Sequence, residues 1–113
     1  METIFSKIIR KEIPATIVFE NERILAFRDI HPVAPVHIVI IPKKEIESVA
    51  ALTIKDEALI GEIFFVIRHL AEEEGIDESG YRVVTNSGPD SKRDVEHLHF
   101  HLIGGKPLGP KIG

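Results

Sequence analysis

The stretch HLHFHL, residues 97–102, decides the fold of this chain. Histidine and large apolar residues alternate along it, and the side chains of a β-strand point alternately to opposite faces of a sheet. The alternation therefore predicts a strand with an apolar face that packs on a core. The other face carries three imidazoles, His97, His99 and His101, which bury little apolar area and point to chemistry instead.

A zinc site is the first alternative for three neighbouring histidines. Zinc ligands lie about 2 Å from the metal, whereas the outer two imidazoles start roughly 13 Å apart along a strand. One metal therefore takes at most two of them. The chain has no Cys, so further ligands would come from His37, Asp or Glu. We expect no metal and no other cofactor.

Composition narrows the class of protein. The chain has 113 residues, 43% of them hydrophobic, and a formal net charge of −4. This length predicts one domain over residues 1–113. The acidic balance argues against a nucleic-acid partner, and no apolar run is long enough to span a membrane. The absence of Cys fits a reducing, cytoplasmic location.

Hydrophobic spacing predicts an α+β order of elements. The expected elements are a helix over 4–10, a hairpin of strands 16–20 and 24–28, a buried strand over 36–41, a helix from Thr53 to Gly75, and a strand over 81–85. His37 lies within the most apolar of these strands. A buried imidazole needs a hydrogen-bonding partner, so His37 is a candidate to support the three histidines.

The helix that follows Thr53 has more apolar residues than one packing surface needs. Phe64 and Phe65 belong to this surplus, which predicts a second packing partner. We expect that partner to be another copy of the chain, giving a homodimer. The alternative is that the N-terminal helix covers the extra apolar surface.

A loop of turn-forming residues, 86–91, immediately precedes the histidine strand. Such a turn can point several main-chain N–H groups at an anion. Lys92 and Arg93 add positive charge beside it. The loop alone is typical of a solvated surface segment, but its position beside the histidines predicts an anion site for phosphate.

Residues 97–105 resemble the signature of the histidine-triad (HIT) superfamily, and residues 3–15, 25–30 and 37–44 are similar to its Hint branch. The resemblance implies a HIT-like α+β fold: an antiparallel sheet of about five strands with two helices. It also implies a homodimer across which the sheet is extended.

The implied activity is hydrolysis of purine nucleoside 5′-phosphoramidates such as adenylyl-amines, with AMP- or GMP-type nucleotides as ligands. In this reading His99 is the nucleophile that takes the nucleotidyl group, His97 and His101 flank the phosphate, and His37 is a buried relay partner. The implied nucleotide contacts are an apolar slot for the base (Phe5, Ile8, Ile13, Phe27 and Ile30), Asp29 for the ribose hydroxyls, and Asn86 with the backbone of Lys92, Arg93 and Asp94 for the phosphate.

Imidazole chemistry agrees with this implication. A reference pKa near 6.5 leaves most of an imidazole neutral and nucleophilic at pH 7. Attack on phosphorus splits one displacement into two steps through a covalent intermediate. Neighbouring imidazoles, if protonated, can donate to phosphoryl oxygens and supply the proton of a leaving amine.

The chain departs from the family pattern at Arg93, where the family usually has Gln, at Ser91, where it often has Gly, and at Asp94, where Hint proteins often have Ser; residues 107–113 also lack the Trp found in some Hint proteins. A carboxylate near a phosphate is repulsive unless Arg93 or a protonated histidine offsets it. We therefore hypothesise an altered leaving-group preference or a slower chemical step. The alternative functions are a dinucleoside polyphosphate hydrolase, a non-catalytic nucleotide-binding regulatory protein, and a zinc-binding protein.

Overall fold

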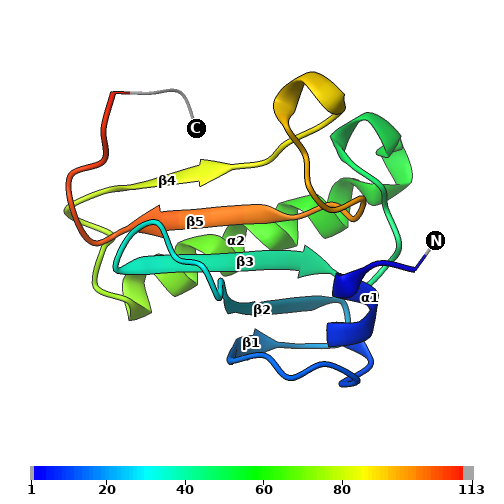
Figure 1. Cartoon of the computed structure of the whole chain (residues 1–113), viewed down its shortest axis with the longest axis horizontal. Helices are drawn as coiled ribbons and strands as arrows, with labels where there is room; N and C mark the ends of the chain where they lie inside the picture. The colour runs from blue at the N-terminus through cyan, green and yellow to red at the C-terminus, as the bar shows by residue number, and fades with distance from the viewer. Residues whose placement is uncertain (1, 111–113) are drawn as a thin grey trace.

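A computed structural model describes residues 2–110, and it contains one antiparallel five-stranded sheet in the order β1-β2-β3-β5-β4 (Figure 1). The strands are β1 (Ile17–Glu20), β2 (Ile24–Arg28), β3 (Val36–Pro42), β4 (Tyr81–Val84) and β5 (Phe100–Gly104). Together with two α-helices they confirm the predicted α+β architecture. The expected domain also includes residues 1 and 111–113, which lie outside the described residues.

The central strand β3 is buried along its whole length, as its apolar sequence predicts. It pairs with β2 on one side and with β5 on the other. Pro42, which was expected to follow the strand, is its last residue. In the β3–β5 pair, His37 is opposite Ile103 and Val39 is opposite His101. This register brings the two predicted histidine positions to neighbouring strands.

Helix α2 (Glu57–Glu73) crosses one face of the sheet (Figure 1). A capping box of Thr53 and Asp56 precedes it, with a 3₁₀ turn over Ile54–Asp56 between cap and helix. Beyond the helix, Gly75 takes a positive φ of 71°, a conformation that glycine adopts at little cost. Helix α2 buries Ile63, Ile67 and other apolar residues against the sheet.

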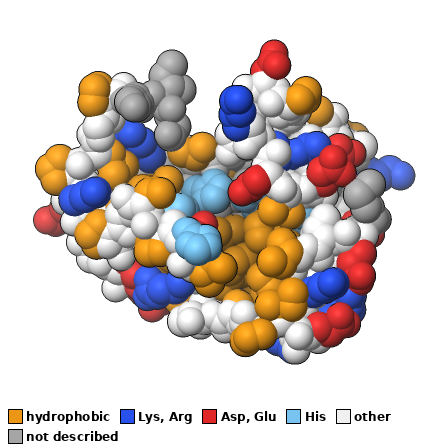
Figure 2. Space-filling model, viewed as in Figure 1, with side chains coloured by type: hydrophobic (Ala, Val, Ile, Leu, Met, Phe, Trp, Pro, Cys, Tyr) orange, Lys and Arg blue, Asp and Glu red, His pale blue; other side chains and the backbone are white. Residues whose placement is uncertain are grey.

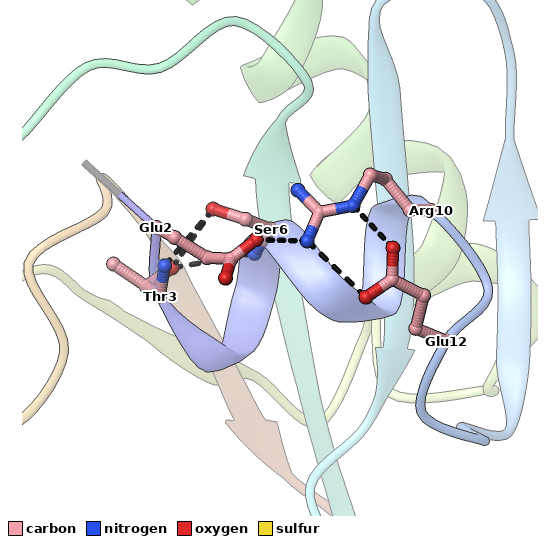
Figure 3. A network of polar contacts seen from close by, with 5 residues as sticks. All are labelled: Glu2, Thr3, Ser6, Arg10 and Glu12. Carbon is pink, nitrogen blue, oxygen red and sulfur yellow. Dashed lines mark hydrogen bonds and ion pairs between the residues drawn. The ribbon is translucent and has the colours of Figure 1, made fainter.

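Helix α1 (Ile4–Ile9) lies on the opposite face of the sheet. A capping box holds its first turn: Ser6 N–H donates to Thr3 Oγ1 (3.3 Å) and Thr3 N–H donates to Ser6 Oγ (3.1 Å) (Figure 3). Phe5 and Ile8 pack there in a separate apolar cluster from that of α2. The N-terminal helix therefore does not cover the surplus apolar surface of α2, and that alternative was wrong.

Strand β5 begins at Phe100, three residues later than predicted. The alternation nevertheless holds from residue 97 onward, because Leu98, Phe100 and Leu102 all belong to the apolar cluster under α2. Leu98 is held in line by its N–H, which donates to the carbonyl of Ile46 (2.7 Å). Among the described residues no helix is both long and apolar enough to cross a membrane.

Candidate nucleotide site

A cavity of about 230 Å³ opens on the α1 face of the sheet, between α1 and the loops that follow β2 and precede β5. Figure 2 shows histidines and hydrophobic side chains at the base of the hollow in this face. Nine of the predicted site residues line the cavity: Phe5, Ile8, Ile13, Phe27, Asp29, Ile30, Asp94, His99 and His101. The structure thus brings together the apolar slot, both carboxylates and two of the three histidines.

The ring of His99 is oriented by a main-chain carbonyl. Its Nδ1 lies 2.7 Å from the carbonyl oxygen of His97, which can only accept a hydrogen bond. His99 therefore carries a proton on Nδ1, and in the neutral ring the lone pair is on Nε2. The edge of Phe5 packs on the ring at a centroid distance of 5.0 Å. The result is a fixed imidazole whose Nε2 is suited to nucleophilic attack.

A chain of hydrogen bonds sets the proton position on His101. The N–H of Val33 donates to Nδ1 of His37 (3.2 Å), so the neutral His37 ring carries its proton on Nε2. That nitrogen lies 2.9 Å from Nδ1 of His101, which accepts the proton's hydrogen bond. A neutral His101 consequently has its own proton on Nε2, the nitrogen that remains for a ligand.

Burial keeps these rings neutral. Desolvation lowers the pKa of His37 and, together with the nearby His99 and His37 rings, lowers the pKa of His101 to about 4. Desolvation likewise lowers the pKa of His97. These lowered pKa values favour neutral His37, His97 and His101 rings in the ligand-free site near pH 7. His101 acts as a neutral hydrogen-bond donor.

His97 does not line the cavity, although it was expected to flank the phosphate. Its side chain is buried, with 2% of the residue's surface exposed, and its Nε2 lies 2.8 Å from the carbonyl oxygen of Pro42, to which it donates. The ring packs near Phe5 at a centroid distance of 6.1 Å. His97 thus supports the site from beneath, while its main-chain carbonyl orients His99.

The loop before β5 differs in part from the prediction. Asn86 donates its side-chain N–H to the carbonyl of Ser91 (2.9 Å) and stabilises the turn, outside the cavity lining. The N–H of Lys92 donates to Pro89 within the same turn (3.1 Å). Among the described residues, the main-chain N–H groups of Arg93 and Asp94 have no hydrogen-bond acceptor. These two donors are the part of the loop suited to an anion.

The side chain of Arg93 does not line the cavity. It is 12% exposed and forms ion pairs with Glu47 (3.2 Å) and Glu96 (3.4 Å). The carboxylate of Asp94 is 85% exposed and lies 3.9 Å from Nε2 of His99. The sequence suggested that Arg93 could offset the charge of Asp94. In the structure its guanidinium is paired with Glu47 and Glu96 instead.

Asp29, His37 and His101 offer ligand atoms within 4.8 Å of one another, the kind of cluster that can hold a metal. The hydrogen bonds of this cluster argue for a different use. His37 Nε2 carries the proton that His101 accepts, and Asp29 Oδ2 lies 3.4 Å from the same nitrogen. A metal would have to displace that proton from between the three groups. Only one of the three cluster members belongs to the HLHFH run.

Sequence reasoning missed several residues of the cavity wall. Its lining also includes Ile4, Pro14, Ala15, Arg28, His31, Val39 and Val95. His31 is exposed, yet it lines the cavity and its N–H donates to Asp29 Oδ1 (2.8 Å). Alternation along β3 could have indicated Val39, because it is two residues from His37 and therefore on the same face of the sheet. In the structure Val39 is opposite His101. His69 is a surface residue on α2 and pairs with Glu73.

The lowered pKa of His101 predicts a loss of stability in mild acid. Between pH 6.5 and about 4 the unfolded chain binds a proton at this residue and the folded protein does not, so stability falls as the pH falls. The limiting effect for His101 is about 3 kcal/mol. Urea unfolding between pH 7.5 and 4.5 should show the decline, and the slope should be smaller in His101→Asn. An equal slope in both proteins would contradict the assignment.

Comparison with known proteins agrees with this geometry. The family model for the HIT domain matches residues 10–108. The purine nucleoside phosphoramidase of Escherichia coli K12 is 48% identical over 111 residues, which cover 98% of this chain and 93% of that protein. A 14 kDa zinc-binding protein of Zea mays is 48% identical over 109 residues, covering 94% of this chain and 84% of that protein.

Solved structures show the same likeness. The crystal structure of a HIT family hydrolase from Legionella pneumophila superposes with a TM-score of 0.96 at 44% identity, covering 99% of this chain and all of that one. A histidine triad protein from Clostridium difficile gives a TM-score of 0.94 at 43% identity, covering 99% of this chain and 97% of that one. This chain belongs to the HIT family.

Proposed function

We propose that this protein is a nucleoside phosphoramidase, which hydrolyses the P–N bond of purine nucleoside 5′-phosphoramidates such as adenylyl-amines. The observation that carries the proposal is the orientation of His99, whose Nε2 is left for attack while Nδ1 is bound by the His97 carbonyl. The identity of 48% to a purine nucleoside phosphoramidase supports the same reaction. No cofactor enters this chemistry.

In the first step, Nε2 of His99 forms a bond to the phosphorus, and the P–N bond breaks. The amine nitrogen takes the electron pair of that bond together with a proton from solvent water, and leaves as the free amine. His101 donates its Nε2–H to the reacting group, and the main-chain N–H groups of Arg93 and Asp94 donate to phosphoryl oxygens. In the second step water displaces His99 and releases the nucleoside monophosphate.

The apolar slot and Asp29 give the nucleoside its place in this proposal. Phe5 and Phe27 contact each other edge to face at 5.6 Å and form one wall of the cavity. A flat purine suits such a wall, because aromatic and aliphatic side chains bury its faces. Asp29 already accepts one hydrogen bond from the loop, and its carboxylate is suited to accept others from the ribose hydroxyls.

A comparison of two substrates tests the proposal against the alternative of dinucleoside polyphosphate hydrolysis. We expect the purified protein to cleave the AMP amide of butylamine with a higher kcat/KM than diadenosine tetraphosphate. Faster cleavage of the dinucleotide would assign the protein to polyphosphate hydrolysis instead. Binding of AMP without cleavage of either compound would assign it to nucleotide binding alone. Turnover in excess chelator is expected to be unchanged.

We also propose that two copies of the chain form a homodimer through the exposed side of α2 and the β4 edge. Phe64 and Phe65 are 49% and 70% exposed, and Phe64 packs on Phe100 at a centroid distance of 5.6 Å. Strand β4 is at one edge of the sheet, where a second copy can extend the ladder. Both features predict the same partner surface.

We also propose a cytoplasmic location for this protein.

Replacing Phe65 with glutamate is expected to convert the dimer into monomers at micromolar concentration. The substitution places a charge in the centre of the proposed interface, where it has no partner. Sedimentation velocity of the two proteins measures the change. Val49→Glu, an equally drastic change at a residue that is 41% exposed outside α2 and β4, should leave the dimer intact. A monomeric parent protein would contradict the proposal.

A further inference from the structure

Asp94 places a carboxylate beside the reacting nitrogen, and no basic side chain of its own loop neutralises it. Its Oδ1 is 3.9 Å from Nε2 of His99. Arg93 is held by Glu47 and Glu96, and Lys92 is exposed and does not line the cavity. In Figure 2, acidic side chains are visible next to the histidines in the hollow. Among the described residues, the loop therefore places an unpaired carboxylate at the cavity, while Arg28, which also lines it, is paired with Glu74.

The separation of Asp94 from His99 places the Asp94 carboxylate close to the phosphorus of any bound substrate. Reacting atoms approach to roughly 3–3.5 Å before a bond forms. A phosphorus atom bound at His99 Nε2 is thus no more than about 7.5 Å from the Asp94 carboxylate, given the separation of 3.9 Å. This is within the Debye length of about 8 Å at physiological salt. Asp94 consequently senses the charge of the leaving group attached to that phosphorus.

We infer that Asp94 selects the leaving group by charge, and that this protein prefers phosphoramidates whose amine carries a second, positively charged group. A diamine or a basic amino-acid side chain is the class of amine that fits. Leaving groups with a carboxylate or further phosphates are disfavoured by the same charge. The inference rests on the proposed phosphoramidase activity and specifies its substrate class.

The magnitude follows from Coulomb's law in a solvent-exposed site. A unit charge on the leaving group that lies as near to Asp94 as the phosphorus, at about 7.5 Å, changes a rate roughly three- to tenfold for an effective dielectric constant between about 35 and the 80 of water. The ratio of rates for a cationic and an anionic leaving group is therefore expected to be roughly ten- to a hundredfold. The constant charge of the nucleotide cancels in this ratio, so the ratio isolates the leaving group.

Three AMP amides of similar length test the inference: those of 1,4-diaminobutane, butylamine and 4-aminobutyrate. Wild type should give the highest kcat/KM with the diamine and the lowest with the carboxylate. Asp94→Asn should reduce the ratio of these two values at least fivefold, and roughly 1 M salt should reduce the wild-type ratio similarly. Asp90→Asn removes an exposed acid from the same loop outside the cavity and should leave the ratio unchanged.

An unchanged ratio in Asp94→Asn, with all three amides cleaved, would overturn this inference and leave the phosphoramidase assignment standing. A wild-type protein that cleaves none of the three amides would overturn that assignment, and the inference with it. Because Asp94 is 85% exposed, the variant is expected to fold like the parent protein, so a change in the ratio reports charge.

Discussion

Replacement of His99 with asparagine is expected to lower kcat for an adenylyl-amine by at least about 10⁴-fold, because the amide nitrogen of asparagine has no nucleophilic lone pair to attack phosphorus. The asparagine amide N–H can still donate to the His97 carbonyl, which now accepts from His99 Nδ1. The local hydrogen bond is thereby preserved. Intact-mass analysis after rapid alkaline quenching should detect a nucleotidyl adduct on wild type and none on His99→Asn.

The control for this prediction is nucleotide binding. The variant should bind AMP with an affinity within about tenfold of that of the parent, since the apolar slot and Asp29 are untouched. Adduct formation on the variant would show that another group is the nucleophile. Loss of both binding and thermal unfolding cooperativity would show instead that His99, with only 3% of its surface exposed, is needed for folding.

Replacement of His37 with leucine is expected to reduce kcat by roughly 10²-fold, the cost of losing one well-placed donor at a reacting group. Without His37, Nδ1 of His101 has lost the donor that now lies 2.9 Å away. The proton of His101 is then free to occupy either nitrogen. In the wrong tautomer a lone pair, instead of an N–H, faces the substrate.

His37→Gln separates this role from simple packing. A glutamine amide can donate to His101 without any proton choice, so we expect it to recover about tenfold of the loss in kcat. The acid limb of the pH profile should move in His37→Leu and much less in His37→Gln, because the donor to His101 restricts its protonation. Equal kcat values and equal pH profiles for the two variants would contradict the relay.

The local pattern of the sequence was sufficient for most of the scaffold. Strand β2 was predicted at its observed bounds, Ile24–Arg28, and the helix was predicted to begin at Thr53, which forms the observed capping box with Asp56. Two-residue alternation in 97–102 also assigned the histidines and the apolar residues to opposite faces. Each of these features depends on neighbours a few residues apart, which a sequence displays directly.

The chemistry of each histidine was decided by partners that are remote in the chain. His97 donates to Pro42, and His101 accepts from His37. Burial among these elements then lowers the pKa of His101, which sequence spacing does not reveal. Sequence reasoning therefore placed His97 against the phosphate, whereas its N–H is occupied beneath the cavity.

The sequence by itself determined which residue types meet at this site, because strand alternation and helix spacing are local properties of the chain. Only the tertiary structure decided which nitrogen of each imidazole carries the proton and which two carboxylates pair with Arg93. Those outcomes depend on carbonyls, N–H groups and charges brought together by the packing of β3 against β5 and of the loops around them. A hydrogen bond requires a partner within about 3 Å, and that distance exists only in the folded chain.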